Sequence, residues 1–267
     1  MKYSLLLIVI VVASCSTNKQ TSITKSSGSG SITIDGKLFA ALYQQYASEY
    51  RALCYQAYNI ARLRLDQQLQ QSGTRPKAII TDVDETLLDN SANTVHQSLL
   101  GNDFNQASWY DWTSRSNADT VPGALNFLKY ASSNGVSIYY ITNRDEKERA
   151  ATVQNLKKFN FPDADDIHLL PKQESASKEI RRQQVMKDYE VVLLLGDNLG
   201  DFSDLFDKRS VEVRMDNTNK VATLFGNRFI VLPNPVYGDW ETALYHYNYN
   251  YTSRQKDSVI RSLLKGY

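Results

Sequence analysis

Short apolar runs separated by amphipathic segments make up the central part of the chain. The clearest runs are 77–81 (KAIIT), 136–142 (VSIYYIT) and 191–195 (VVLLL), and weaker ones cover 210–215 and 228–232. Runs of this length predict strands that are buried on both faces. Because they alternate with helical patterns, the sequence predicts an α/β fold with a parallel sheet covered by helices.

Helical periodicity dominates two stretches around these runs. Apolar residues recur every three to five positions from Leu38 to Leu65, which predicts one N-terminal helix that ends at 72–76 (SGTRP). The segment 145–159 begins with acidic residues and ends with lysines. That order complements a helix dipole and predicts a second helix.

The start of the chain is typical of an export signal. Lys2 precedes an apolar run over 5–12, and small residues lead to Cys15. The run is shorter than the roughly 20 residues that span a bilayer. The V-A-S-C ending resembles the bacterial lipobox, whose cysteine is lipidated; the alternative is an ordinary signal peptide with a chance cysteine.

A tract rich in Ser, Thr and Gly follows this signal and has almost nothing to bury. It predicts a flexible tether between the lipid and a folded domain. We therefore expect a signal peptide at 1–14, the lipidated cysteine with its linker at 15–36, and one domain over 37–267.

The composition excludes several classes of protein. The 267 residues include 30 basic and 29 acidic side chains, a balance that argues against a dedicated nucleic-acid binder. Two cysteines allow neither a disulfide framework nor a four-thiolate zinc site. With Cys15 as the anchor, Cys54 is expected to be a buried free thiol. Because the basic and acidic side chains balance, any attraction for phosphate must come from nearby groups and not from the net charge of the protein.

Polar side chains follow three of the predicted strands. D-V-D-E-T stands at 82–86, T-N-R at 142–144 and G-D-N-L-G-D at 196–201. In open parallel sheets, ligands bind at the carboxyl ends of the strands. Carboxylates gathered there repel one another unless a cation neutralises them, and oxygen-only ligands favour Mg²⁺. Such a site, with a carboxylate free to attack phosphorus, suits phosphoryl transfer.

This ordered set resembles the haloacid dehalogenase (HAD) superfamily and, within it, the class C bacterial acid phosphatases, the lipoprotein e type of 5′-nucleotidase. The segments that carry the resemblance are D-E-T-L-L-D-N-S (84–91), I-T-N-R (141–144), K-x-x-R (178–181), G-D-N-x-x-D-F (196–202) and L-P-N-P-x-Y-G-D-W-E (232–241). The resemblance implies a HAD-like Rossmannoid parallel sheet flanked by helices. It also implies a small, mostly helical cap formed by about 87–120 plus C-terminal segments.

Two details depart from the family pattern. The second motif begins with Thr142 where serine is usual, which keeps the hydroxyl group. The segment around Lys178 lacks a further nearby lysine, for which Lys172 is either a displaced counterpart or a surface residue.

The resemblance also implies catalytic roles. Asp82 would be the nucleophile that forms an aspartyl-phosphate, and Asp84 the general acid and base. Lys178 would neutralise the nucleophile and the phosphoryl group. Thr142 and Asn143 would donate hydrogen bonds to the oxygens of that group.

A metal site is implied by the same motifs. Mg²⁺ would bind Asp82, the backbone carbonyl of Asp84, and Asp197. Asp201 would stand behind them, holding metal-bound waters or the catalytic lysine. Arg144 would add positive charge for the substrate phosphate.

Aromatic residues are the candidates for holding the rest of the substrate. By resemblance, Phe104, Trp109, Trp112 and Tyr237 would clamp a nucleotide base, since base stacking tolerates different bases. The alternative is that the two tryptophans, which are three residues apart, form one buried face of a helix. Asn90 would hydrogen-bond the substrate or the lid.

We therefore expect a Mg²⁺-dependent phosphomonoesterase, an acid phosphatase or 5′-nucleotidase acting on nucleoside monophosphates and similar esters. It would be exported and lipid-anchored to a bacterial membrane, the outer membrane being the expected one. Its partners would be small phosphomonoesters and the membrane, not a nucleic-acid polymer, and a homodimer is left open. The alternatives are a surface lipoprotein that binds haem or a host factor on the same scaffold, and a phosphotransferase; the intact motif set favours the hydrolase.

Overall fold

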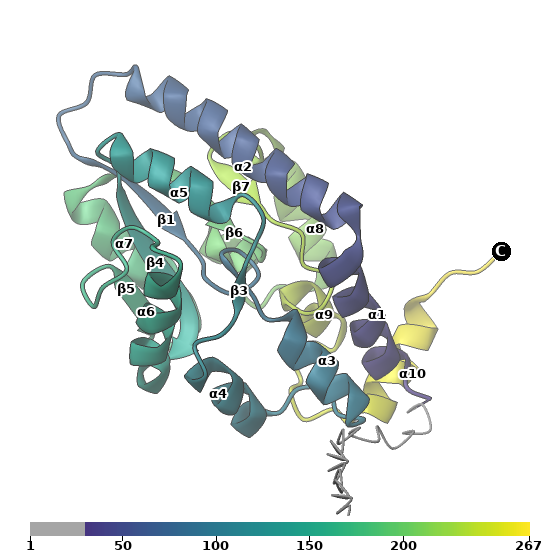
Figure 1. Ribbon diagram of the computed structural model, residues 1–267. Coiled ribbons are helices and arrows are strands. Elements are labelled where there is room, and N and C mark those ends of the chain that lie inside the picture. Colours follow the sequence, from purple (N-terminus) through teal and green to yellow (C-terminus); the bar gives the residue numbers. More distant parts are fainter. Residues whose placement is uncertain (1–29) are drawn as a thin grey trace, which may run out of the picture.

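The computed structural model describes residues 30–267 (Figure 1). The expected signal peptide, the expected lipidation site Cys15 and nearly all of the expected tether lie outside the described residues. Among the described residues, no helix is long and apolar enough to cross a membrane.

A five-stranded parallel sheet in the order β5-β4-β1-β6-β7 forms the centre of the molecule. Its strands are β1 (Lys77–Thr81), β4 (Ser137–Asp145), β5 (Leu169–Lys172), β6 (Glu190–Gly196) and β7 (Phe229–Val231). The first motif strand, β1, lies in the middle, so the loop that follows it opens onto the centre of the carboxyl edge.

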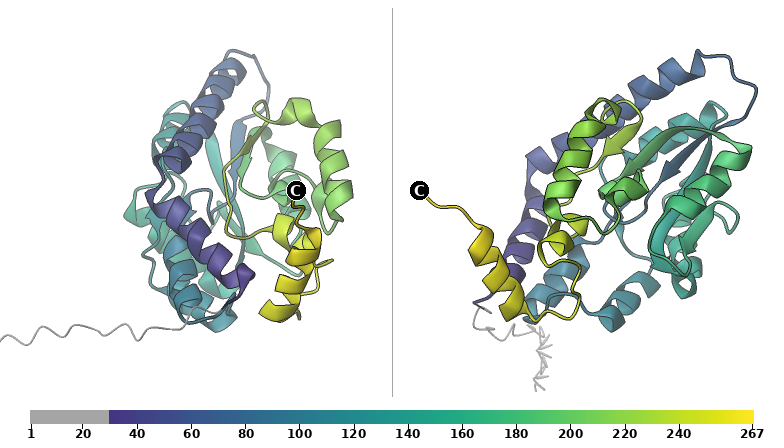
Figure 2. Two further views of the ribbon diagram at one scale, coloured as in Figure 1. Left: turned by 90° about the vertical axis from the view of Figure 1, so that its right-hand side faces the viewer. Right: turned by 180° about the vertical axis from the view of Figure 1, so that it is seen from behind.

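Helices cover both faces of the sheet, as Figure 2 shows. Side chains of α2 (Ser48–Leu69), α5 (Ala124–Ser133) and α6 (Arg149–Lys158) pack on one face in a single buried cluster. Val185 of α7 (Glu179–Asp188) packs on the other face. Alternate residues of β1 point to opposite faces, which is why its apolar run is continuous. The mixed α/β class and the parallel sheet flanked by helices are thus confirmed.

Smaller elements surround the carboxyl edge of this sheet. The remaining elements are α1 (Ile32–Tyr46), β2 (Leu88–Asp89), α3 (Ser91–Leu99), α4 (Gln106–Ser114), β3 (Asp119–Thr120), η1 (Glu146–Glu148), η2 (Leu199–Asp201), η3 (Asp204–Phe206), α8 (Val211–Lys220), η4 (Ala222–Leu224), α9 (Asp239–Leu244) and α10 (Ser253–Leu263). Helices α3 and α4 lie between the paired strands β2 and β3, in the segment expected to form the cap. Helix α1 packs against α3 and α10.

The expected single N-terminal helix is two helices. Ala47 has extended backbone angles and separates α1 from α2. Tyr50, Ala57 and Leu65 are buried as the periodicity implied, whereas Leu42 is exposed. Because Leu53 of α2 is also exposed, the pattern describes α2 only in part, and it assigns the wrong face to α1.

The strand expected at 210–215 was wrong, because this segment begins helix α8. The Ser210 side chain accepts a hydrogen bond from the backbone N–H of Val213, which caps the helix. The apolar residues that suggested a strand do not enter the core, since Val213 and Met215 are exposed while Arg214 is buried.

Strand β5 was not expected from the sequence. It is short and contains Pro171, which cannot donate a hydrogen bond to a neighbouring strand. Its place at the edge of the sheet accommodates the proline. By contrast, 77–81 is confirmed without change, and the strand expected at 136–142 continues to Asp145, so the T-N-R motif lies inside β4.

Candidate active site

The loop after β1 places Asp82 at the centre of the carboxyl edge. Its backbone N–H donates to the carbonyl of Leu195 on β6 at 2.9 Å, which continues the sheet pairing by one residue. The buried Lys178 side chain, at the start of α7, contacts Asp82 Oδ1 and also lies 2.7 Å from Asp201 Oδ1. The first and third motifs therefore meet at one lysine, as expected.

Three carboxylates gather around this lysine. Asp82, Asp197 and Asp201 each offer an oxygen, and these oxygens lie within 4.8 Å of one another. The close approach requires Gly196, because a Cβ atom there would lie 2.2 Å from Asp201 Oδ2. Asp201 thus belongs to the same oxygen cluster as the two expected metal ligands.

The charges in this cluster do not balance. Burial raises the pKa of Asp82 to about 7, against the opposing effect of Lys178. Burial, reinforced by the charge of Asp201, also raises the pKa of Asp197 well above its usual value. Burial opposes the charge of Lys178, but the two neighbouring carboxylates outweigh it and raise that pKa. Three acids facing one ammonium group fit a bound divalent cation, and the oxygen-only donor set suits a hard one.

Asp197 is oriented by two neutral donors. Thr86 Oγ1 donates to its Oδ1 at 3.2 Å, and Asn234 Nδ2 donates to its Oδ2 at 2.7 Å. The sequence reasoning gave Asn234 no role. Its place in the L-P-N-P segment was the available signal, since that segment carried the family resemblance.

The expected acid–base residue, Asp84, is paired with an arginine. Arg144 Nη2 lies 2.7 Å from Asp84 Oδ1, and Arg144 Nε lies 3.0 and 3.2 Å from the two carboxylate oxygens. Asn90 Nδ2 donates to the same Oδ1 at 2.8 Å. Arg144 was expected to face the substrate; it borders the cavity, but its guanidinium group is buried and engaged with Asp84.

The second motif is fixed by an arginine that the resemblance had matched only as part of K-x-x-R. Arg181 donates to the carbonyl of Thr142 at 2.6 Å and to Asn143 Oδ1 at 2.8 Å. Asn143 borders the cavity, as expected for a residue that binds phosphate. The Thr142 side chain is fully buried, and its Oγ1 accepts from the backbone N–H of Arg144 at 3.2 Å.

A cavity of about 780 Å³ opens over this edge. Asp82, Asp84, Lys178 and Asp197 border it, so the expected nucleophile, acid, lysine and metal ligand share one space. That volume is within the range of small-molecule sites.

Aromatic side chains border the same cavity. Phe104, Trp109 and Tyr237 do so as expected, and the rings of the first two lie 6.5 Å apart. Trp112 is not among the residues that border it. Its ring packs against the core, and its Nε1 donates to Asn90 Oδ1 at 2.8 Å, so the expected direct contact with substrate is not supported. Through this bond Asn90 contacts α4, the helix of the cap that is here called the lid helix.

The tyrosine-rich segment 245–251 forms another wall. Tyr245 is buried, whereas Tyr249 is largely exposed at the cavity rim. Tyr247 and Tyr251 also border the cavity. Tyrosine occupies every second position from 245 to 251, but these residues lie in the turns after α9 and not in a strand.

Two further expectations concern single residues. Cys54 is buried and free, as expected. Lys172 pairs with Asp145 at 2.5 Å and does not border the cavity, which places it outside the catalytic cluster.

Comparisons with known proteins match the fold that carries this site. Two structures of the class C acid phosphatase from Bacillus anthracis, one with tungstate bound, match with a TM-score of 0.85 at 40% sequence identity. The match covers 88% of this chain and 99% and 98% of those chains. The stem 31 kDa glycoprotein of Glycine max is 25% identical over 164 residues, or 59% of this chain, which spans only 58% of that relative.

A family model covers most of the sequence. The model described as HAD superfamily, subfamily IIIB (acid phosphatase), matches residues 15–240. Together with the structural match, this supports phosphomonoester hydrolysis as the activity. The chain belongs to the subfamily IIIB acid phosphatases of the HAD superfamily.

Proposed function

We propose that this protein is a Mg²⁺-dependent phosphomonoesterase that prefers nucleoside monophosphates. The observation that carries the proposal is the juxtaposition of Asp82 with Lys178, Asp197 and Asp201 in one cavity. A buried carboxylate held by an ammonium group, beside an excess of negative charge, is the arrangement of a nucleophile that works with a cation.

Two carboxylates share the chemistry. The free oxygen of Asp82 attacks phosphorus, an O–P bond forms, and the ester O–P bond breaks. Asp84 gives a proton to the departing oxygen and then takes one from the water that hydrolyses the aspartyl-phosphate. Because Lys178 contacts Asp82 Oδ1, we assign Oδ2 as the attacking atom.

The cation would be held by Asp82, Asp197 and the backbone carbonyl of Asp84, with Asp201 contributing charge. When bound, Mg²⁺ would supply positive charge against the phosphate oxygens. Asn143 and Lys178 stand beside that position and would bind the same oxygens. A related structure is described with tungstate, a tetrahedral oxyanion, which supports an oxyanion site of this kind here.

Nucleotides are proposed because the cavity is both large and aromatic. It extends from Asp82 to Phe104, Trp109 and Tyr237, which offer flat surfaces for a base. Stacking on such rings contributes about 1–3 kcal/mol per base with little preference among bases. We propose further that the enzyme acts at a membrane, tethered by a lipid on Cys15.

Phosphate release from a substrate panel tests this proposal. The full chain is assayed with Mg²⁺ on nucleoside monophosphates, nicotinamide mononucleotide and aryl phosphates, at acidic to neutral pH. We expect nucleotides to give the highest kcat/KM and chelation to abolish turnover. No phosphate release from any substrate would overturn the proposal, and retained binding with no turnover would favour a ligand-binding lipoprotein instead.

The lipid anchor needs a separate test. The full chain is expressed in a bacterium supplied with radiolabelled palmitate. We expect label on the wild-type chain and none on Cys15→Ser. Equal labelling of the two would overturn the anchor without affecting the catalytic proposal.

A further inference from the structure

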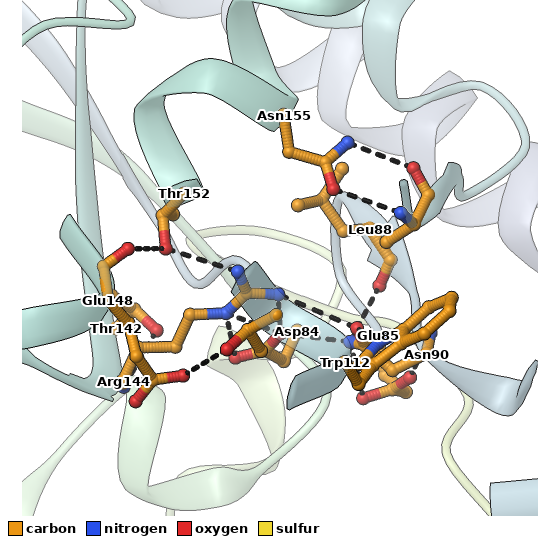
Figure 3. Close-up of polar contacts among 12 residues, drawn as sticks. Asp84, Glu85, Leu88, Asn90, Trp112, Thr142, Arg144, Glu148, Thr152 and Asn155 are labelled. Carbon is orange, nitrogen blue, oxygen red and sulfur yellow. Dashed lines mark hydrogen bonds and ion pairs between the residues drawn. The ribbon is translucent and has the colours of Figure 1, made fainter. Parts of the chain in front are cut away.

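A relay of hydrogen bonds joins the lid helix α4 to Asp84 (Figure 3). Trp112 Nε1 donates to Asn90 Oδ1 at 2.8 Å, and Asn90 Nδ2 donates to Asp84 Oδ1 at 2.8 Å. Asn90 is 1% exposed, so neither of its contacts is readily replaced by water. The relay thus connects an element above the cavity with the residue expected to move the proton.

The chemistry of the tryptophan fixes the orientation of the amide. An indole N–H can only donate, so the Asn90 atom that faces Trp112 must be the carbonyl oxygen. The amide nitrogen is then forced to face Asp84, where it donates. The opposite orientation would point Asn90 Oδ1 at a carboxylate. The Asn90 backbone N–H donates to Glu85 Oε1 at 2.8 Å and holds the residue in place, and the amide Nδ2 also lies 3.4 Å from Glu85 Oε2.

The two oxygens of Asp84 are held unequally as a result. Oδ1 accepts from Asn90 and from Arg144 Nη2 and Nε, at 2.7 to 3.0 Å. Within the described part of the chain, the only hydrogen bond to Oδ2 is the 3.2 Å contact from Arg144 Nε. Oδ2 is therefore the oxygen of this carboxyl group with room for a further partner, because Oδ1 is already occupied by donors.

Arg144, which also binds Asp84, is held in place by further hydrogen bonds within the protein. Arg144 Nη1 donates to Thr152 Oγ1 at 3.1 Å, and Thr152 donates onward to the carbonyl of Glu148 at 2.8 Å. Glu148 in turn accepts from Thr113 of α4 at 2.9 Å. Both sides of Asp84 are thus connected to the same lid helix, although only the Trp112 side reaches it through a single residue.

We propose that Trp112 is a positioning residue for proton transfer: through Asn90 it holds Asp84 Oδ1, so that Oδ2 delivers the proton to the leaving oxygen. This inference rests on the proposed function, in which Asp84 is the proton donor. Trp109, one turn earlier on α4, borders the cavity and lies 5.7 Å from the Arg144 guanidinium carbon. The helix that meets the leaving group therefore also orients the acid that protonates it.

Leaving-group dependence separates this role from a merely structural one. The leaving group of an alkyl phosphate, such as a nucleoside 5′-monophosphate, is a basic alkoxide that needs the proton. The leaving group of p-nitrophenyl phosphate is a weakly basic phenolate that needs it much less. Trp112→Phe keeps an aromatic side chain, smaller than the indole, and removes the N–H. We expect kcat for the alkyl substrate to fall about 3- to 10-fold, the worth of one hydrogen bond, and kcat for the aryl substrate to fall less than about twofold.

Tyr110→Phe is the matched control on the same helix. It also removes one donor, because the Tyr110 hydroxyl binds Asp145, but that contact does not lead to Asp84. We expect both substrates to respond equally to this change. Circular dichroism and the thermal midpoint establish that each variant is folded.

A double-mutant cycle with Asp84→Asn completes the test. Where Asp84 no longer donates a proton, Trp112→Phe should have no further effect on the alkyl substrate. A uniform loss on both substrates, or an undiminished loss in the Asp84→Asn background, would overturn the inference while leaving the phosphatase intact. An inactive wild type would overturn the proposed function instead, so the two failures are distinguishable.

Discussion

Two clusters of charged side chains border the same cavity, and they are built on opposite principles. The catalytic cluster sets three carboxylates against Lys178. The second cluster, here called the clasp, consists of Lys37, Asp103, Glu241 and Lys256. Lys37 pairs with Asp103 at 2.5 Å and with Glu241 at 3.0 Å, and Lys256 also contacts Asp103, so two cations meet two anions.

This difference separates catalysis from architecture. The clasp joins α1, the loop after α3, α9 and α10, and its charges are satisfied within the protein. The catalytic cluster has more carboxylates than its lysine can neutralise, so a bound cation, or bound protons in its absence, must offset the excess. Partly buried charges in balance hold elements together, whereas buried charges out of balance indicate a site for a cation and an anionic substrate.

The strongest test of the comparison removes one acid from the catalytic cluster. Asp82→Asn keeps the shape of the side chain and eliminates the nucleophile. We expect kcat to fall by at least about 10⁴-fold, as for other covalent nucleophiles, with the fold retained. Phosphate release measures the loss, and circular dichroism checks the fold. Appreciable turnover by this variant would remove Asp82 from its assigned role.

Exchanging one lysine in each cluster gives the next largest effect. Lys178→Met leaves three carboxylates without their ammonium partner, and we expect kcat to fall about 10²- to 10³-fold, as when other electrostatic donors are lost. Lys37→Met is the matched change in the clasp. We expect it to lower the thermal midpoint and to change kcat for p-nitrophenyl phosphate by less than about threefold. Equal loss of activity in the two variants would refute the division between the clusters.

The catalytic cluster was predictable from sequence and the clasp was not, for a physical reason. Asp82 and Asp197 follow strands of a parallel sheet, and Asn143 lies near the end of one. Strand order alone brings such positions to one edge. Asp103 and Lys256 lie on a loop and a C-terminal helix, and nothing in the local pattern pairs them. Contacts of that kind depend on how the cap folds over the sheet.

The same limit explains the errors at single residues. Trp112 was expected at the substrate, and its ring type alone could not show that its N–H faces Asn90. Arg144 was expected to meet phosphate, but it pairs with Asp84 from a part of β4 where the strand register shifts, between Ile141 and Asp145. The identities of the residues were predicted, but the directions of their side chains required the three-dimensional structure.

A change in pH should affect the stability contributed by the two clusters with opposite sign, and metal removal should affect the catalytic cluster alone. The pKa of Asp82 is raised from 3.8 to about 7 in the metal-free fold, so the folded state binds the extra proton. Metal-free stability contributed by this group is therefore present below pH 4 and is lost as the pH rises through about 7.

A bound divalent cation should reverse this loss, because its ligands must be deprotonated. At a metal concentration of about 100 times Kd the stabilisation is about 2.7 kcal/mol, or about 5–10 °C in Tm for a domain of this size. Differential scanning fluorimetry with Mg²⁺ and with chelator, from pH 4.5 to 7.5, measures the gain. A gain that does not grow with pH would contradict the assignment of these carboxylates as ligands.

The clasp should show the smallest effect and the opposite pH dependence. Burial disfavours the charge of Asp103, but Lys37 and Lys256 outweigh it and lower its pKa, so its stabilising contribution is present at neutral pH and lost only as the pH falls below about 4. Asp103→Asn should cost about 1–2 kcal/mol of unfolding free energy, because Glu241 still pairs with Lys37 and the partly exposed Lys256 can reach water.

The matched control is Asp111→Asn, which breaks the exposed pair with Arg115 on α4, where the side chains are 63% and 62% exposed. We expect no measurable change in Tm from it, since exposed pairs are strongly solvated. The Asp103→Asn deficit should be independent of Mg²⁺ and should disappear when the pH is lowered far enough to protonate Asp103 in the wild type. A deficit that instead varied with Mg²⁺ would mean that the clasp and the catalytic cluster are energetically coupled, and the charges of the cavity would then have to be treated as one system.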